Sequence, residues 1–394
     1  MIRHTHRRRG LTAATALTGI ALVLTGCSSG PDEKSAKKQD GPASATGRLA
    51  VSTPGGISVL DAETLKVVDQ FTTEQFTRLN AAGDGQHVFV TTSKGFQLLD
   101  TATPKLTDTV VPATTAGHVV RHADKTVLFD DGTGTTSIFD TADLTEPTST
   151  YTAPAAHHGV SIVLEDGTLL TTVGDETSRS GATAMTKSGD DWTETTSTDQ
   201  CPGIHGEGTA KDEAVVFGCE DGALLYSGGA FEKLDAPDEF GRMGNAYVSE
   251  TSPIVVGDYK TDPDAEGYLL NAVTLIDTAN KTLEVVDLPD DVQYTFRDVA
   301  RGPGDRAYIL STDGNIHVLE PTTGELVDEI PVVEPWEGPV EWQDAHPAIT
   351  VDGDVAYVTE PATRSVHAVD LTTGTITATT TLDAAPNEIA IALG

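Results

Sequence analysis

A pattern of about 40 residues recurs along the chain from Arg48 onward, and this repeat restricts the possible folds more than any other feature. Each copy joins short runs of β-branched, leucine and aromatic residues through Gly/Asp turns, which is typical of consecutive antiparallel strands. Clear copies begin at residues 81, 301 and 351. The body has no long helical period, so the sequence predicts an all-β fold.

We divide the body into eight units of four expected strands each. Their ranges are 48–71, 76–111, 117–152, 157–200, 204–236, 241–290, 294–333 and 344–383. The first unit lacks an opening strand, and residues 387–394 resemble a spare one. Such a strand would complete the first unit and close a ring, so we predict an eight-bladed β-propeller over residues 48–394. Seven blades is the main alternative, because the fourth and sixth units carry insertions. A pair of β-sandwiches does not explain the regular spacing.

The first 26 residues have the features of an export signal. A basic start with four arginines precedes an apolar run from Leu11 to Leu24, which is too short to span a membrane. The run ends in Leu-Thr-Gly-Cys27, which resembles a bacterial lipobox; an ordinary secretory signal is the alternative. We therefore predict removal of residues 1–26 and attachment of lipid to Cys27. Residues 28–47 would form a flexible tether, which leaves the protein anchored to the membrane outside the cytoplasm.

The balance of charge narrows the classes of partner. The chain has 25 Lys and Arg against 60 Asp and Glu, a formal charge of −35. Without the four arginines of the leader, 21 basic residues remain and the charge is −39. A polyanion of this kind does not bind nucleic acid. The charge attracts cations in general but does not by itself specify a metal site.

Two cysteines remain in the body once Cys27 is assigned to the lipid anchor. Cys201 and Cys219 form an even pair in a chain that we expect to reach an oxidising compartment, so a disulfide is the first expectation. Ligation of a metal by both is the alternative. The closely spaced cysteines of many zinc sites are absent from the sequence, which favours the disulfide.

Histidines concentrate at one position of the repeat. In a propeller the first strand of each blade faces the central channel, so equivalent residues lie at one height. When the units are aligned on their second strands, this position holds Arg78, His118, His205, Asp298 and His346. In the fourth unit the same place holds the pair His157 and His158. A single histidine there more often bonds to water or to the backbone. Five of the nine histidines of the mature chain lie at this position, and this concentration favours a metal site instead.

These side chains are suitable ligands for zinc, since imidazole and carboxylate both bind it. Adjacent blades can bring ligands together, whereas opposite blades lie across the ring from each other, so the sequence allows one site or two. Polar residues near the same level are candidates for orienting the ligands: His122, Glu207 and Asp344. The ligand types alone do not distinguish zinc from copper, nickel or manganese.

Several motifs in the body can be compared with known families. They are CPGIHGEG and FGCEDG around the two cysteines, HHGVSIVLEDG, DAHPAI and the closing PNEIAIAL. Together they resemble the periplasmic zinc metallochaperones of the AztD type, over essentially all of residues 48–394. The resemblance implies a propeller that binds zinc outside the cytoplasm and delivers it to the solute-binding protein of a zinc ABC transporter. It also implies metal-ligand roles for His118, His158, His205 and His346.

Three functions follow as hypotheses. The first is a zinc carrier without enzymatic activity. The second is a lipid-anchored propeller that binds a protein or a cell-wall polymer, with structural channel histidines. The third is a metal-dependent enzyme with an open coordination position in the channel. A serine hydrolase has no support, because the body lacks a GxSxG motif.

Overall fold

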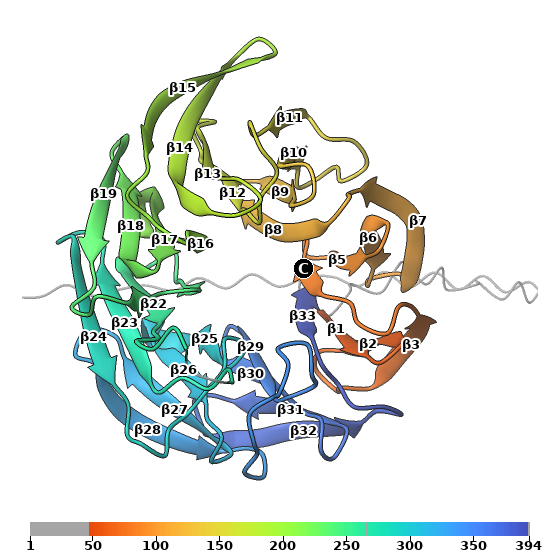
Figure 1. Ribbon diagram of the computed structural model, residues 1–394. Coiled ribbons are helices and arrows are strands. Elements are labelled where there is room, and N and C mark those ends of the chain that lie inside the picture. Colours follow the sequence, from red (N-terminus) through yellow and green to blue (C-terminus); the bar gives the residue numbers. More distant parts are fainter. Residues whose placement is uncertain (1–46, 265–266, 393–394) are drawn as a thin grey trace, which may run out of the picture. The chain divides into compact units, whose positions relative to one another are not determined.

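The computed structural model describes residues 47–264 and 267–392. It confirms the predicted eight-bladed β-propeller: eight antiparallel sheets follow one another around a ring (Figure 1). Each sheet has four strands, and one has an additional short strand, β20 (Gly241–Arg242). The predicted signal segment, Cys27 and most of the tether lie outside the described residues.

The first four blades follow the predicted units. Blade 1 contains β33 (Ile389–Ala392), β1 (Arg48–Thr53), β2 (Gly56–Asp61) and β3 (Val67–Thr72). Blade 2 contains β4 (Leu79–Ala81), β5 (His87–Thr92), β6 (Gly95–Asp100) and β7 (Lys105–Pro112). Blade 3 contains β8 (Ala116–His122), β9 (Lys125–Asp130), β10 (Thr135–Asp140) and β11 (Ser149–Thr152). Blade 4 contains β12 (Ser161–Val163), β13 (Leu169–Gly174), β14 (Arg179–Ser188) and β15 (Asp191–Thr198).

The other four blades include two short 3-10 helices. Blade 5 contains β16 (His205–Ala210), η1 (Lys211–Glu213), β17 (Ala214–Cys219), β18 (Asp221–Ser227) and β19 (Ala230–Asp235). Blade 6 contains β21 (Ala246–Tyr247), β22 (Ile254–Asp258), β23 (Ala272–Asp277) and β24 (Thr282–Asp287). Blade 7 contains β25 (Val299–Arg301), η2 (Pro303–Asp305), β26 (Ala307–Leu310), β27 (Asn315–Glu320) and β28 (Glu325–Pro331). Blade 8 contains β29 (Ala348–Asp352), β30 (Val355–Glu360), β31 (Ser365–Asp370) and β32 (Thr375–Thr381).

The last strand closes the ring, as the repeat predicts. β33 pairs antiparallel with β1 over four residue pairs, from Arg48 opposite Ala392 to Val51 opposite Ile389. It is the innermost strand of blade 1. The innermost strands of blades 2 to 8 are, in order, β4, β8, β12, β16, β21, β25 and β29. These innermost strands surround the axis of the ring in Figure 1. We call the side of the ring at which they begin the top face.

The core lies between neighbouring blades, where the middle strands are almost wholly buried. One hydrophobic cluster joins blades 3, 4 and 5 through residues such as Val120, Ile162 and Phe217. Burial of a side chain of this size stabilises the fold by about 1.5–3 kcal/mol. These three blades therefore share one core and hold their innermost strands at set positions. Among residues 47–264 and 267–392, no helix combines the length and hydrophobicity required to cross a membrane.

Candidate metal centre

Three of the predicted histidines converge at the top face. His118 of blade 3, His158 of blade 4 and His205 of blade 5 each offer a ring nitrogen, and these atoms lie within 4.8 Å of one another. The ring centroids are 5.0–5.3 Å apart. The Nε2 atoms of His158 and His205 are separated by 3.0 Å. Within the described part of the chain, this is the one group of three potential metal ligands found this close together.

Irregular strand pairing directs two of these side chains toward each other. The register of β8 shifts between Ala116 and Val119, which surround His118, and the register of β16 shifts between His205 and Gly208. Bulges of this kind re-aim a side chain. Gly206 within the second bulge has a φ of +65°, and a Cβ atom there would lie 2.6 Å from the carbonyl oxygen of Gly244. The bulge that presents His205 therefore depends on glycine.

Hydrogen bonds determine which nitrogen of two rings is available. The Nδ1 atom of His158 lies 2.6 Å from Oδ2 of Asp131, and Nδ1 of His205 lies 2.6 Å from the carbonyl oxygen of Gly244. Both oxygens are acceptors, so each Nδ1 carries its proton and each neutral ring presents a lone pair on Nε2. The two lone pairs face each other at 3.0 Å. They repel unless a proton or a metal ion lies between them.

The arrangement fits a zinc ion. Zinc binds histidine nitrogen at about 2.0–2.1 Å, and tetrahedral angles then place two ligand nitrogens about 3.3 Å apart. The observed separation of the Nε2 atoms of His158 and His205 is close to this value. A histidine that donates its other ring N–H to a carboxylate or a carbonyl is the usual form of a zinc ligand. The donor set, its spacing and its orientation therefore suit zinc.

The surroundings keep two of the rings neutral. Burial lowers the pKa of His205 to about 3, although the hydrogen bond to Gly244 opposes this shift. Burial also lowers the pKa of His118 well below its ordinary value, and the neighbouring His205 and His158 lower it further. Metal ions bind the neutral imidazole, so His118 and His205 need not lose a proton first. His158 is the most exposed of the three, with 46% of its side chain open to solvent.

The sequence did not single out Asp131, which holds His158. Its second oxygen, Oδ1, accepts the backbone N–H of Gly159 at 3.3 Å. Gly117 makes room for the carboxylate, because a Cβ atom at that position would lie 2.3 Å from Oδ1. The preceding residue, Asp130, accepts the backbone N–H groups of Thr114 and Thr115, which precede β8, and that of Gly132 in its own turn, so its role is structural. The sequence Asp-Asp-Gly is typical of an ordinary turn, and only the contact between blades reveals the role of Asp131.

The other predicted ligands lie outside this cluster. His157 is buried, with its two ring nitrogens 3.0 Å from the carbonyl oxygen of Ala155 and 3.0 Å from Oγ1 of Thr172. Both nitrogens therefore have protein partners. His346 in blade 8 places Nδ1 2.7 Å from the carbonyl oxygen of Asp344 and stacks on Trp336. Blade 8 is opposite blade 4 in the ring, which separates it from the cluster.

Asp298 of blade 7 is fully buried and also stands apart from the three histidines. Its Oδ2 accepts the N–H of Thr295 at 2.6 Å, while Oδ1 has no hydrogen-bond partner in the structure. Burial raises the pKa of this carboxyl to about 8. The group is therefore largely protonated and uncharged at neutral pH, unlike a carboxylate that holds a metal.

None of the three predicted orienting groups is found bonded to the clustered histidines in the described residues, and two of them have other partners. Nε2 of His122 lies 2.8 Å from Oε1 of Glu213. The carboxylate of Asp344 accepts the N–H of Glu341 at 3.0 Å. Burial raises the pKa of Glu207 to about 7, and the positive charge of Arg121 opposes the shift. Asp131 and the Gly244 carbonyl take the orienting role at the cluster instead.

A disulfide joins Cys201 to Cys219, the pairing that the sequence predicts. Both residues are fully buried, and their Cα atoms are 5.0 Å apart. The bond ties the turn that leads into His205 to the end of β17. The turn is tightened by the N–H of Ile204, which donates to the carbonyl of Cys201 at 3.2 Å. The disulfide thus constrains the backbone directly before one of the three histidines.

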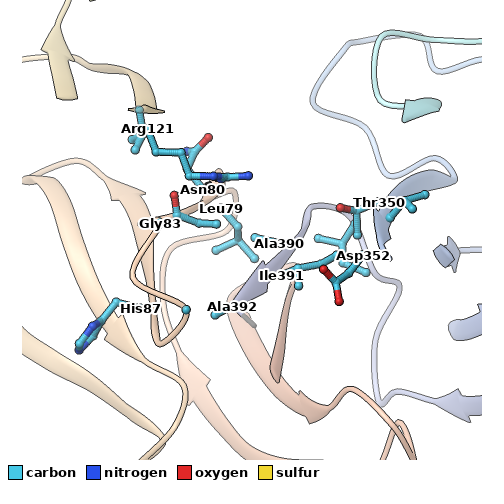
Figure 2. A pocket seen from close by; sticks show the side chains of 15 residues that line it. Leu79, Asn80, Gly83, His87, Arg121, Thr350, Asp352, Ala390, Ile391 and Ala392 are labelled. Carbon is cyan, nitrogen blue, oxygen red and sulfur yellow. Dashed lines mark hydrogen bonds between the residues drawn. The ribbon is translucent and has the colours of Figure 1, made fainter. Parts of the chain in front are cut away.

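A separate cavity of about 370 Å³ lies against several of the innermost strands. It is lined by all of β4 and β33 and by the later residues of β8 and β29, including Leu79, Ala390 and Ile391. Figure 2 shows Arg121 and Asp352 on opposite sides of it. None of the three clustered histidines lines this cavity, so it is distinct from the candidate metal centre.

The buried Asp298 predicts how stability changes at alkaline pH. Its pKa is raised from 3.8 to about 8 in the folded protein, so the folded state binds more protons than the unfolded state between these values. The resulting stability is full below pH 3.8 and is lost as the pH rises through 8. We expect the free energy of unfolding to fall by about 1 kcal/mol between pH 7 and 9. Urea unfolding at both values measures this, and Asp298→Asn should remove most of the loss. An unchanged loss in the variant would contradict the assignment.

Comparison with known proteins supports a relationship in sequence and in fold. No family model matches the chain. The zinc chaperone AztD of Citrobacter koseri is 23% identical over 312 residues, which cover 75% of this chain and 70% of that protein. The structure of apo AztD from the same organism superimposes with a TM-score of 0.70 at 20% identity, covering 88% of this chain and 97% of that chain.

A second solved structure shares the architecture. The dihydro-heme d1 dehydrogenase NirN, solved in complex with DHE, has a TM-score of 0.62 at 13% identity and covers 89% of this chain and 76% of that chain. At this identity the likeness shows the propeller fold alone. AztD differs from it because it matches this chain by sequence as well as by fold. The predicted resemblance of the chain to proteins of the AztD type is therefore confirmed.

Proposed function

We propose that the chain is an extracytoplasmic zinc chaperone. It holds one zinc ion between His118, His158 and His205 and delivers it to the solute-binding protein of a zinc ABC transporter. The observation that carries the proposal is the pair of Nε2 lone pairs facing each other at 3.0 Å, each ring held by a hydrogen bond at Nδ1. The similarity to the zinc chaperone AztD supports zinc as the cargo.

Three ligands with an open side suit transfer better than storage. Zinc in a closed structural site has four protein ligands, whereas this cluster supplies three and leaves the fourth tetrahedral position to water or to an incoming group. His158 is the ligand that reaches solvent. An acceptor can therefore bind the ion first and displace His158, while His118 and His205 still hold the other side.

A three-histidine site with an open position also occurs in zinc enzymes. Such an enzyme needs a free group to move protons at the metal. The carboxylate beside this cluster, Asp131, is bonded to His158 and to the N–H of Gly159, so it orients a ligand. We therefore propose a carrier without enzymatic activity.

The location also bears on delivery. The disulfide between Cys201 and Cys219 is consistent with an oxidising compartment. We propose that lipid on Cys27 anchors the protein at the membrane and that residues 28–47 act as its tether. An anchored donor meets an anchored or membrane-associated acceptor at a raised effective concentration, which speeds delivery without a new contact.

A transfer experiment tests the proposal. The chain is loaded with one equivalent of zinc, freed of excess metal and mixed with a metal-free solute-binding protein from a zinc ABC transporter. We expect the transfer rate to rise with acceptor concentration and to exceed the rate of release into a chelator solution. A chain that retains no zinc would overturn the proposal. A transfer rate equal to spontaneous release at every acceptor concentration would show that delivery is not direct.

Asp131→Asn gives a specific prediction for the cluster. The amide keeps the size of the carboxylate but loses its charge, so His158 is less firmly held and less basic. We expect zinc affinity to fall by about 10–100-fold, as for other changes of groups that orient a metal ligand. Competition with a chromophoric chelator measures the effect. Asp84→Asn is the matched control, because Asp84 pairs with His87 in blade 2 away from the cluster. Equal effects of the two changes would contradict the role of Asp131.

A further inference from the structure

Two arginines lie on the backbone segments that hold His205. The carbonyl of Arg179 accepts the N–H of Gly203 at 2.8 Å, and Nη1 of Arg242 donates to the carbonyl of Gly203 at 3.4 Å. Gly203 comes two residues before His205. Arg242 also comes two residues before Gly244, whose carbonyl accepts the Nδ1–H of His205. Both arginines therefore belong to the top face beside the histidine cluster.

Neither guanidinium is fully neutralised by the protein. Nη1 of Arg179 is buried and has no hydrogen-bond partner in the structure. Arg242 approaches the carboxylate of Glu220 only to 3.7 Å, and 46% of the Glu220 side chain is exposed. Arg242, with 25% of its side chain exposed, therefore has hydrogen-bonding capacity for a group from outside, and Arg179 adds an unpaired N–H in the buried layer behind it.

Positive charge beside a site for a cation is unfavourable for holding that cation. The chain has a formal charge of −35, so carboxylates are plentiful, yet these two arginines contact the backbone segment that leads into His205. Guanidinium groups bind carboxylates well, through charge and paired hydrogen bonds. A carboxylate is also a zinc ligand. The same anionic group can therefore contact the arginines and enter the open coordination position.

We infer that Arg179 and Arg242 form an anion-binding rim, which receives an aspartate or glutamate side chain of the zinc acceptor beside the histidine cluster. This inference rests on the proposed function, because the carboxylate is taken to belong to the protein that accepts the zinc. Charge complementarity supports this inference. The net negative charge of the chain repels the carboxylates of a partner, whereas the two arginines attract a carboxylate at this one place. The arginines weaken zinc binding and recruit the group that removes the ion.

The double variant Arg179→Gln/Arg242→Gln tests the rim through two opposite effects. Loss of two nearby positive charges should tighten zinc binding by about threefold to tenfold. The rate of zinc transfer to nitrilotriacetate, a carboxylate chelator, should fall by about tenfold more than the tighter zinc binding of the variant accounts for. Transfer to a neutral pyridine-amine chelator should slow only as much as the tighter binding requires. Arg306→Gln, at an exposed arginine paired with Glu320, is the matched control and should change none of these values.

Two outcomes would overturn the inference. Weaker zinc binding in the double variant, with an unchanged melting temperature, would show that the arginines support the site structurally. Equal slowing of transfer to both chelators, beyond the change in affinity, would show that no anion is recognised. A further arm needs no zinc: malonate should raise the melting temperature of the metal-free chain but not of the double variant. Equal stabilisation of the wild-type chain and the double variant by malonate would reject the rim. Failure of the wild-type chain to retain zinc would reject the proposed function alone.

Discussion

Replacement of His118, His158 or His205 by alanine is expected to lower the affinity of the chain for zinc by about 100-fold in each case. A structural zinc site with four ligands has an apparent binding free energy of about 10–16 kcal/mol, or about 3 kcal/mol for each ligand. Loss of one ligand therefore costs about two orders of magnitude in the dissociation constant. Any two replacements together should abolish retention of zinc, because a single imidazole remains.

His346→Ala is the matched control for this series. His346 occupies the equivalent position of the repeat in blade 8 but lies outside the cluster. Its replacement should leave zinc affinity within about threefold of the wild-type value. Affinities are compared by competition with a chelator, after circular dichroism has shown that each variant is folded. A 100-fold loss with His346→Ala, or none with His205→Ala, would show that the site is elsewhere.

Removal of the disulfide should affect stability and zinc binding together. Cys201 and Cys219 are 18 positions apart, and closing a loop of this length stabilises a fold by about 3 kcal/mol on the chain-entropy model. The free energy of unfolding of the Cys201→Ala/Cys219→Ala variant should therefore fall by about that amount. Zinc affinity should also fall, because the disulfide constrains the turn that leads into His205.

Reduction provides the control for this prediction. A thiol reductant should destabilise the wild-type protein in urea unfolding and weaken its zinc binding, while the double alanine variant should not respond. If the variant unfolds at the same urea concentration as the wild-type protein, the disulfide does not stabilise the fold. If only stability changes and zinc affinity does not, the turn holds His205 without the disulfide.

The repeat was sufficient to predict the architecture. Alternating β-rich runs and Gly/Asp turns recur with one spacing, and a spare strand at residues 387–394 completes the first unit. The same alignment identified His118 and His205 as residues at one height of the ring. It also selected His346 and Asp298, because a repeat position determines height along the axis but not the distance across it.

Side-chain direction was the part that the sequence could not provide. His157 and His158 are adjacent, but one packs against Phe129 while the other reaches the cluster. The hydrogen-bond partners of the rings were equally hidden. Asp131 contacts His158 from the next blade, and the acceptor for His205 is a backbone carbonyl, which no side-chain pattern reports. These contacts depend on how neighbouring blades pack.

The pairing of β33 with β1 also determines how the molecule comes apart. A solenoid has two free ends, and its terminal repeats fray before its centre. Here the first and last segments of the propeller hold each other through a shared sheet, so neither can peel away alone. Fraying from either end of the propeller must therefore first break this seam. A newly made chain, by the same reasoning, gains this protection only when its final strand has emerged.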